Sequence, residues 1–366
     1  MKQLSVLLAD TILARYPDPD SIPYRPWCYV QGYVLAGLEK LWQFTGNPAY
    51  FAYIHKFVDQ HVTPNGSLQG FTGESLDDMM AGTMVVAVYQ HTGAEKYRLA
   101  ARHIRQMFDD YPRNSDGGFW HARNLPGQMW IDGVFMGGMF LARYDAVIGE
   151  QQACFDEVTR QILILASHCR KAGSGLFLHA YDESHRAAWA DPLNGLSPEV
   201  WSEGLGWYAL VLVETLGLMS PISPNRAMVM QVLLELAEGL RQAQDTHTGL
   251  WYQVVDQGQR PDNWHDTSGS AMFTYTLQRT IDLGYLNPAI YTPVVQQAYA
   301  GLLTKAVINP QGLVDIYDAC DGVCVQRSYA DYINYPRAVN AKEAIGSLLW
   351  GAIAVETASG VIQKEQ

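Results

Sequence analysis

The 366-residue sequence contains little charge, few basic residues and few cysteines, and each shortage excludes a class of protein. Only 17% of the residues are charged whereas 48% are hydrophobic, which is far from the composition of a disordered chain. The 25 basic residues are outnumbered by 37 acidic ones, and the net charge of −12 repels phosphate backbones and anionic membranes. We therefore expect a globular protein with no nucleic-acid partner and no membrane partner.

Targeting segments and a disulfide framework are also missing. No apolar run reaches the roughly 18 residues that span a bilayer, and the apolar N-terminal segment is interrupted by Asp10 and Arg15. The odd number and scattered positions of the cysteines favour reduced thiols in the cytoplasm, and the spacing of the last two gives no full zinc-ligand set. The five are Cys28, Cys154, Cys169, Cys320 and Cys324.

Several catalytic motifs are absent as well. The sequence has no phosphate-binding GxxxxGK[ST], no dinucleotide-binding GxGxxG after a strand, no GxSxG elbow and no HExxH zinc motif. Ser202 and Ser268 are accordingly expected to be helix caps rather than nucleophiles. We predict no metal and no organic cofactor.

What the chain does contain is aromatic residues, glycine and a hidden repeat. It has 10 Trp, 21 Tyr and 32 Gly, a mixture suited to a concave site with stacking faces. A short phrase of glycine followed by apolar or aromatic residues recurs between helical stretches, at separations that fit two helices each. The phrases are PNGSLQG, DGGFWHA, GSGLFLHAYD, HTGLWYQVVD and PQGLVDIYDA.

Hydrophobic periodicity predicts the helices of these repeats. A first helix runs through residues 33–45, ends at Gly46 and is followed by a second from Ala49. The further expected pairs cover residues 78–90 and 95–108, 133–148 and 151–170, 204–217 and 224–243, 268–283 and 289–305, with a last helix at 342–356.

The two members of each pair differ in character. Many first members are apolar nearly all round, as in GVFMGGMFLARY, whereas second members such as EKYRLAARHIRQMF are amphipathic. This predicts an inner and an outer ring of helices, arranged either as a closed all-α toroid of about six hairpins or as an open superhelical stack. In a closed toroid the starts of all inner helices would line one cavity.

Carboxylates and tryptophans recur at these starts, as in SLDD, MWIDG, WSEGLGW and HDTSG. Any single Asp, Ser or Thr at a helix start is ordinarily explained as an N-cap, and His121 or His179 can equally be a structural histidine. A cap, however, does not require a neighbouring tryptophan. Stacking faces beside acid/base groups favour a carbohydrate pocket.

At this point the sequence resembles a known family, the unsaturated rhamnogalacturonyl hydrolases of glycoside hydrolase family 105, which are related to the family 88 unsaturated glucuronyl hydrolases. The segment QMWIDGVFMGGMFLARY is similar to that family's central motif, and VWSEGLGWYALVLVETL supports it. The likeness covers essentially the whole chain in order, and implies one (α/α)6 barrel domain over residues 1–366.

The resemblance also implies a reaction and roles for residues. The substrate would be a small oligosaccharide, made by a polysaccharide lyase during pectin or rhamnogalacturonan degradation, whose non-reducing uronic acid carries a C4=C5 double bond. Asp132 would protonate C4 and activate the water that adds at C5, which requires a raised pKa, and Asp77, rather than its neighbour Asp78, would support it. The substrate-binding positions would be Tyr29, His121, Trp130, His179 and Trp207.

Glu203 departs from the family pattern, which usually has arginine in the WSxGxGW phrase. An ionised glutamate reverses the charge of arginine and only accepts hydrogen bonds, which places the aglycone preference in doubt unless Arg or Lys pairs with it. Alternative functions are another unsaturated uronyl hydrolase, a sugar epimerase or conventional glycosidase on the same toroid, and a noncatalytic glycan-binding protein. The sequence leaves open whether the protein is a homo-oligomer.

Overall fold

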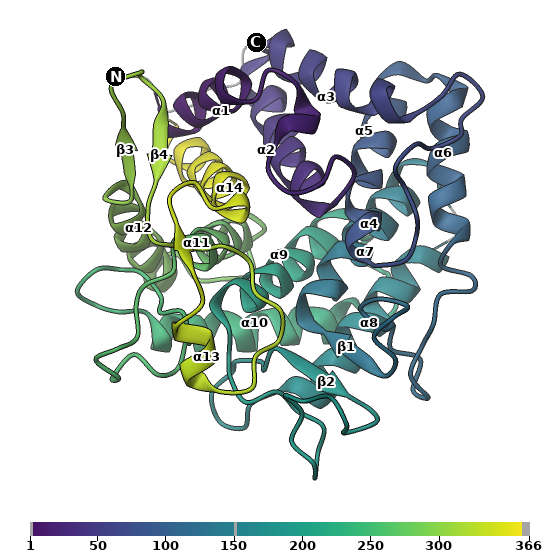
Figure 1. Ribbon diagram of the computed structural model, residues 1–366. Helices are drawn as coiled ribbons and strands as arrows, with labels where there is room; N and C mark the ends of the chain where they lie inside the picture. The colour runs from purple at the N-terminus through teal and green to yellow at the C-terminus, as the bar shows by residue number, and fades with distance from the viewer. Residues whose placement is uncertain (1–2, 150–151, 361–366) are drawn as a thin grey trace.

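The computed structural model of the protein describes residues 3–149 and 152–360. Long helices make up most of the chain, and short two-stranded sheets lie at separate places around them (Figure 1). None of the helices in this described part is both long and apolar enough to cross a membrane.

An inner ring of helices forms the centre of the fold. Its members are α2 (Tyr29–Thr45), α4 (Asp77–Met80) continued by α5 (Gly82–Thr92), α7 (Ile131–Val147), α9 (Ser202–Leu218), α11 (Thr267–Asp282) and α14 (Lys342–Ala358). Each member packs against the next, and α14 packs against α2, so the ring is closed. The open superhelical stack is therefore excluded.

An outer ring surrounds the inner one. It consists of α1 (Leu4–Arg15), α3 (Pro48–His61), α6 (Glu95–Gln106), α8 (Ala153–Cys169), α10 (Arg226–Ala243) and α12 (Pro288–Leu303). Each outer helix packs on neighbouring inner helices, and buried apolar side chains fill the space between the rings. The predicted (α/α)6 barrel is confirmed.

Local signals account for most helix boundaries. Gly46 adopts a left-handed conformation (φ 66°) that ends α2, and the Asn47 side chain caps α3 by accepting from the backbone N–H of Ala49 at 3.1 Å. The helix expected at 78–90 is instead divided at Ala81, and α7 and α9 begin two residues earlier than expected. Residue 151, the expected start of the next helix, lies outside the described residues.

Short sheets and small helices connect the loops at the barrel end. Strand β1 (Gln128–Trp130) pairs antiparallel with β2 (Ala180–Asp182), which ties the segment before α7 to the segment after α8. The other elements are β3 (Ala306–Ile308) paired with β4 (Val314–Ile316), β5 (Ala319–Cys320) paired with β6 (Arg337–Ala338), the 3-10 turn η1 (Pro19–Ser21) and α13 (Tyr329–Ile333).

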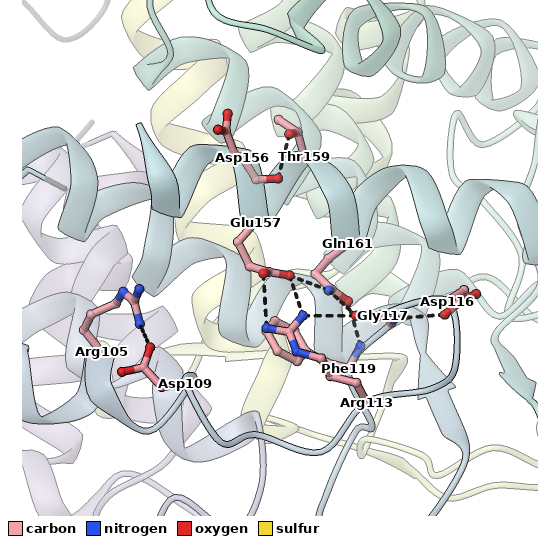
Figure 2. Close-up of polar contacts among 11 residues, drawn as sticks. Arg105, Asp109, Arg113, Asp116, Gly117, Phe119, Asp156, Glu157, Thr159 and Gln161 are labelled. Atoms are coloured by element: carbon pink, nitrogen blue, oxygen red, sulfur yellow. Dashed lines mark hydrogen bonds and ion pairs between the residues drawn. The ribbon is translucent and has the colours of Figure 1, made fainter. Parts of the chain in front are cut away.

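The loop before β1 is fixed on the outer helix α8 (Figure 2). Arg113 forms a two-pronged ion pair with Glu157, at 2.9 and 3.1 Å, and its guanidinium lies over the ring of Phe119. Gln161 accepts from the backbone N–H of Phe119 at 2.8 Å and donates to the carbonyl of Gly117 at 2.9 Å. These contacts hold the glycine-aromatic phrase that leads into His121.

Candidate functional site

A cavity of about 440 Å³ opens at the end of the barrel where the inner helices begin. Residues in the first turns of five inner-ring helices line it, which agrees with the prediction that the helix starts share one cavity. These residues are Tyr29, Asp77, Asp132, Glu203 and Glu343.

A second cavity, of about 450 Å³, is lined by residues from the later parts of the inner helices. Its charged groups largely satisfy one another: Arg143 binds Glu39, and Lys40 binds Glu214 at 2.6 Å. The first cavity instead contains acid groups whose buried oxygens have no such partners among the described residues, on Asp132 and Glu203, so it is the candidate active site.

Two aspartates face this cavity from neighbouring inner helices. Asp77 begins α4 and Asp132 lies in the first turn of α7, with side chains 19% and 14% exposed. Asp78 is turned away, because its carboxylate binds Arg25 at 2.6 Å and Thr72 at 2.5 Å and it does not line the cavity. The structure thus brings Asp77, and not Asp78, together with Asp132.

The pKa values of the two carboxyl groups are shifted in opposite directions. Burial raises the pKa of Asp77, and the negative charge of Asp132 adds to this effect while His121 opposes it. Burial also acts to raise the pKa of Asp132, but His121 and His179 outweigh it and the pKa is lowered overall. The raised pKa is therefore that of Asp77, and the expectation of a raised pKa on Asp132 is wrong.

His121 is placed between these acids and a tryptophan. Its Nε2 lies 3.7 Å from Asp77 Oδ1, and its ring stacks on Trp130 with centroids 4.3 Å apart and planes 14° apart. No described group hydrogen-bonds its buried Nδ1, so it is not a satisfied structural histidine. Gly133 permits this approach, because a Cβ there would lie 2.9 Å from Nδ1.

His179 lies behind Asp132 and has no exposed surface. Its Nε2 is 3.7 Å from Asp132 Oδ1, beyond hydrogen-bond length, and its Nδ1 lies 2.7 Å from the Tyr332 hydroxyl. Burial lowers the pKa of His179, which favours the neutral ring. When Tyr332 donates to Nδ1, the ring proton remains on Nε2 and faces Asp132. His179 does not line the cavity, so its effect on a ligand passes through Asp132.

Aromatic side chains form one wall of the cavity. Trp130, Trp207 and Tyr29 line it as predicted, and Trp207 packs edge to face against Tyr29 at 6.1 Å. Trp201, which precedes α9, also lines the cavity although it was not singled out from the sequence. One face of Trp130 is covered by His121, so only its remaining surface is open to a ligand.

Glu203 is fully buried at the start of α9, and the last inner helix brings a further acid and a lysine to the same cavity. Lys342 lies 3.0 Å from Glu343, whose carboxylate also accepts a hydrogen bond from the Tyr29 hydroxyl. Sequence analysis missed both residues of α14. The signal was their position at the start of an expected inner helix, where Asp132 and Glu203 also lie.

The N-cap explanation holds at one of these helix starts. Asp266 caps α11 by accepting from the backbone N–H groups of Ser268 and Gly269. Asp132 and Glu203 lie inside the first turn and cap nothing. Ser202 and Ser268 were expected to be helix caps, and this expectation is wrong. Their hydroxyls have no hydrogen-bond partner among the described residues.

The chemistry available to this cavity is proton transfer. Asp77 and Asp132 both face it, they interact electrostatically, and their proton affinities differ, so together they can hold a proton beside a bound ligand. Within the described residues no cluster of His, Cys, Asp or Glu has the arrangement to hold a metal ion.

Comparisons with known proteins agree with this geometry. The model for Glycosyl Hydrolase Family 88 matches residues 5–358. A solved glycoside hydrolase of family 105 from C. acetobutylicum is 31% identical, with a TM-score of 0.91 over 97% of this chain and 100% of that chain.

More distant relatives carry more specific descriptions. The unsaturated rhamnogalacturonyl hydrolase YesR of Bacillus subtilis is 24% identical over 316 residues, which cover 85% of this chain and 84% of that protein. The unsaturated glucuronyl hydrolase of Bacillus sp. GL1 shares the fold at 12% identity, with a TM-score of 0.68 over 98% of this chain and 96% of that chain. The chain therefore belongs to Glycosyl Hydrolase Family 88, together with the family 105 enzymes, and is a glycoside hydrolase.

Proposed function

We propose that the protein releases a 4,5-unsaturated uronic acid from the non-reducing end of lyase-generated disaccharides, with the rhamnogalacturonyl type as substrate. The observation that supports this is the Asp77–Asp132 pair facing an aromatic-walled cavity, on the motif that resembles that of the family. The relative YesR is described as acting on this type of substrate.

In the proposed reaction Asp132 gives its proton to C4 of the sugar, and a water molecule adds its hydroxyl at C5 while giving a proton back to Asp132. The resulting hemiketal opens by breaking the bond between C5 and the ring oxygen. The hemiacetal left at C1 then collapses to an aldehyde and releases the aglycone as an alcohol. No bond from the enzyme to the sugar is required.

The proton must move onto Asp132 when substrate binds. The pKa of Asp132 is lowered by His121 and His179, which outweigh its burial, whereas burial raises the pKa of Asp77. A bound sugar expels water and adds its own negative carboxylate, and both effects favour the protonated form of Asp132. Asp77 supplies a nearby site for the proton until then.

Two cationic side chains line the cavity, and each already contacts a carboxylate: Arg25 contacts Asp78 and Lys342 contacts Glu343. The cavity lining includes the guanidinium of Arg25, which is 42% exposed, and the ammonium of Lys342. We propose these as the groups that hold the substrate carboxylate, since the net charge of −12 cannot attract an anion. The five free thiols fit the proposed cytoplasmic site of action on small oligosaccharides.

The test follows the loss of ultraviolet absorbance as hydration removes the conjugated double bond. Purified protein is given unsaturated galacturonyl-rhamnose, unsaturated glucuronyl disaccharides and their saturated counterparts. We expect turnover of the first substrate and loss of at least about a thousandfold in Asp132→Asn. Activity should be retained in the matched control Asp156→Asn, which changes an exposed aspartate of α8. Turnover by Asp132→Asn at the wild-type rate, or turnover restricted to saturated sugars, contradicts the proposal.

A further inference from the structure

Glu203 is a buried acid that faces the cavity without a hydrogen-bond donor. It lies in the first turn of α9, lines the cavity and has 0% exposed surface. Neither of its carboxyl oxygens receives a hydrogen bond from any described residue. A carboxylate in such a place has lost its hydration without replacement, which strongly favours taking up a proton.

The neighbouring acid Glu343 determines which of the two holds that proton. Its Oε1 accepts from the Tyr29 hydroxyl and lies 3.0 Å from the ammonium of Lys342. These donors stabilise the ionised form of Glu343, whereas Glu203 accepts no hydrogen bond of normal geometry and only Lys342 and the Ser268 hydroxyl favour its ionised form. Because two neighbouring carboxylates repel each other, one of the pair tends to remain protonated. Glu343 has the donors that stabilise a negative charge, so the proton resides on Glu203.

The other titratable or polar groups around Glu203 come from every adjacent element. Burial raises the pKa of Glu203 well above its ordinary value, the charges of Glu343 and Asp266 raise it further, and Lys342 and the Ser268 hydroxyl oppose them. The remaining groups that interact with it carry no positive charge; they are Tyr29 and Tyr33 on α2 and Cys320 on β5.

We propose that Glu203 works as an uncharged carboxylic acid and is a specificity-determining residue, whose O–H and C=O bind a hydroxyl group of the substrate as a donor–acceptor pair. This inference rests on the proposed function and concerns the same cavity. An arginine, as the family resemblance implies for this position, forms ion pairs with carboxylates. A neutral acid cannot, but it matches a sugar hydroxyl, which also both donates and accepts.

The assignment has a consequence for the substrate. The part of the sugar that reaches α9 carries a neutral hydroxyl group, and the anionic carboxylate lies elsewhere in the cavity. When Glu203 ionises at alkaline pH it loses its donor and becomes a negative charge in an anion-binding site, so substrate binding weakens.

Two variants distinguish three possible roles of Glu203: a neutral hydrogen-bonding acid, an anion, and a side chain that only fills space. Glu203→Gln keeps the shape and both hydrogen-bonding functions without charge, and Glu203→Met keeps the approximate volume without either. We expect KM of the wild type to rise with increasing pH. Glu203→Gln should lack this rise and stay within about threefold at neutral pH, whereas Glu203→Met should raise KM about tenfold at every pH.

An infrared measurement on the substrate-free protein decides the protonation state without reference to activity. We expect the carbonyl stretching band of a protonated carboxyl group at neutral pH in the difference spectrum of the wild type minus either variant; any band from Asp77 is common to the three proteins and cancels. Absence of that band from the difference spectrum, or a Glu203→Gln variant as impaired as Glu203→Met, overturns the inference. If no unsaturated disaccharide is turned over, the proposed function fails, while the band and calorimetric binding of the disaccharides to the three proteins still decide the role of Glu203.

Discussion

A buried ion pair links two helices of the candidate active site at the end remote from the cavity. Arg143 of α7 donates to both carboxylate oxygens of Glu39 on α2, at 3.0 and 2.5 Å. Glu39 is 2% exposed, and although burial acts to raise its pKa, Arg143 and then His91 and Lys40 lower it to about 2. The same two helices carry Asp132 and Tyr29 at their other ends, so this pair bears on the position of the site.

The size of its contribution follows from the proton affinity. A lowering from 4.5 to about 2 corresponds to about 3.5 kcal/mol in the free energy of unfolding, at about 1.4 kcal/mol for each factor of ten. Because the folded-state pKa is the lower one, this stabilisation is fully present above about pH 4.5 and is lost as the pH falls toward about 2. We expect Arg143→Met to lower the free energy of unfolding by about 3 kcal/mol at neutral pH, since it leaves a buried charge without its main partner.

Urea unfolding followed by circular dichroism measures this effect. The double variant Glu39→Gln/Arg143→Met should recover part of the loss, because it removes the uncompensated charge. Arg98→Met is the matched control: Arg98 pairs with Glu95 at 2.6 Å in similar two-pronged geometry, but both are on the surface, and we expect no measurable change. A loss below about 1 kcal/mol in Arg143→Met, or wild-type stability that does not fall between about pH 4.5 and 2, refutes the reasoning.

Three further predictions concern the cavity. Gly133→Ala should lower kcat/KM at least about tenfold and the free energy of unfolding by about 1–3 kcal/mol, because the added Cβ meets His121 at 2.9 Å; wild-type kinetics would contradict this. Tyr332→Phe should lower kcat about tenfold and change its pH profile, since His179 loses the partner that fixes its tautomer; an unchanged profile would show that the contact is only structural. A bulky thiol reagent should inactivate the enzyme at Cys324, which is exposed and lines the cavity. The rate should rise with pH because the thiolate is the reacting form, and the rise should come at a more alkaline pH than for an ordinary thiol, because burial and the charges of Asp132 and Asp77 raise the thiol pKa. Substrate should protect against the reagent, and persistent inactivation of Cys324→Ser would contradict the assignment.

The sequence predicted the ring of helices well because local signals determine them. Apolar periodicity identifies the inner and outer helices, and cap residues such as Gly46 and Asn47 mark their ends. The division at Ala81 was not predictable, because the apolar pattern runs through it without interruption. Closure of the ring was also left open by the residues alone, since it depends on contacts between the first and last helices.

The candidate site was predicted less completely. Asp77, Asp132 and the tryptophans come together as the motifs indicated. The proton affinities could not be read from the sequence, because they depend on burial and on which histidine lies beside which acid. Glu343 was missed because its pairing with Tyr29 joins residues near opposite ends of the chain.

The contact of α14 with α2 and α1 has a consequence for biosynthesis. A nascent chain on the ribosome exposes both site aspartates long before α14 is translated, yet the wall that contains Lys342 and Glu343 does not exist until that helix is released. Helix α1 also lacks a contact until α14 is made, because its first backbone N–H, on Leu4, donates to the carboxylate of Glu356 on α14 at 2.7 Å. The complete cavity thus exists only in a chain that includes α14, and a protein stalled before this helix is an unclosed ring.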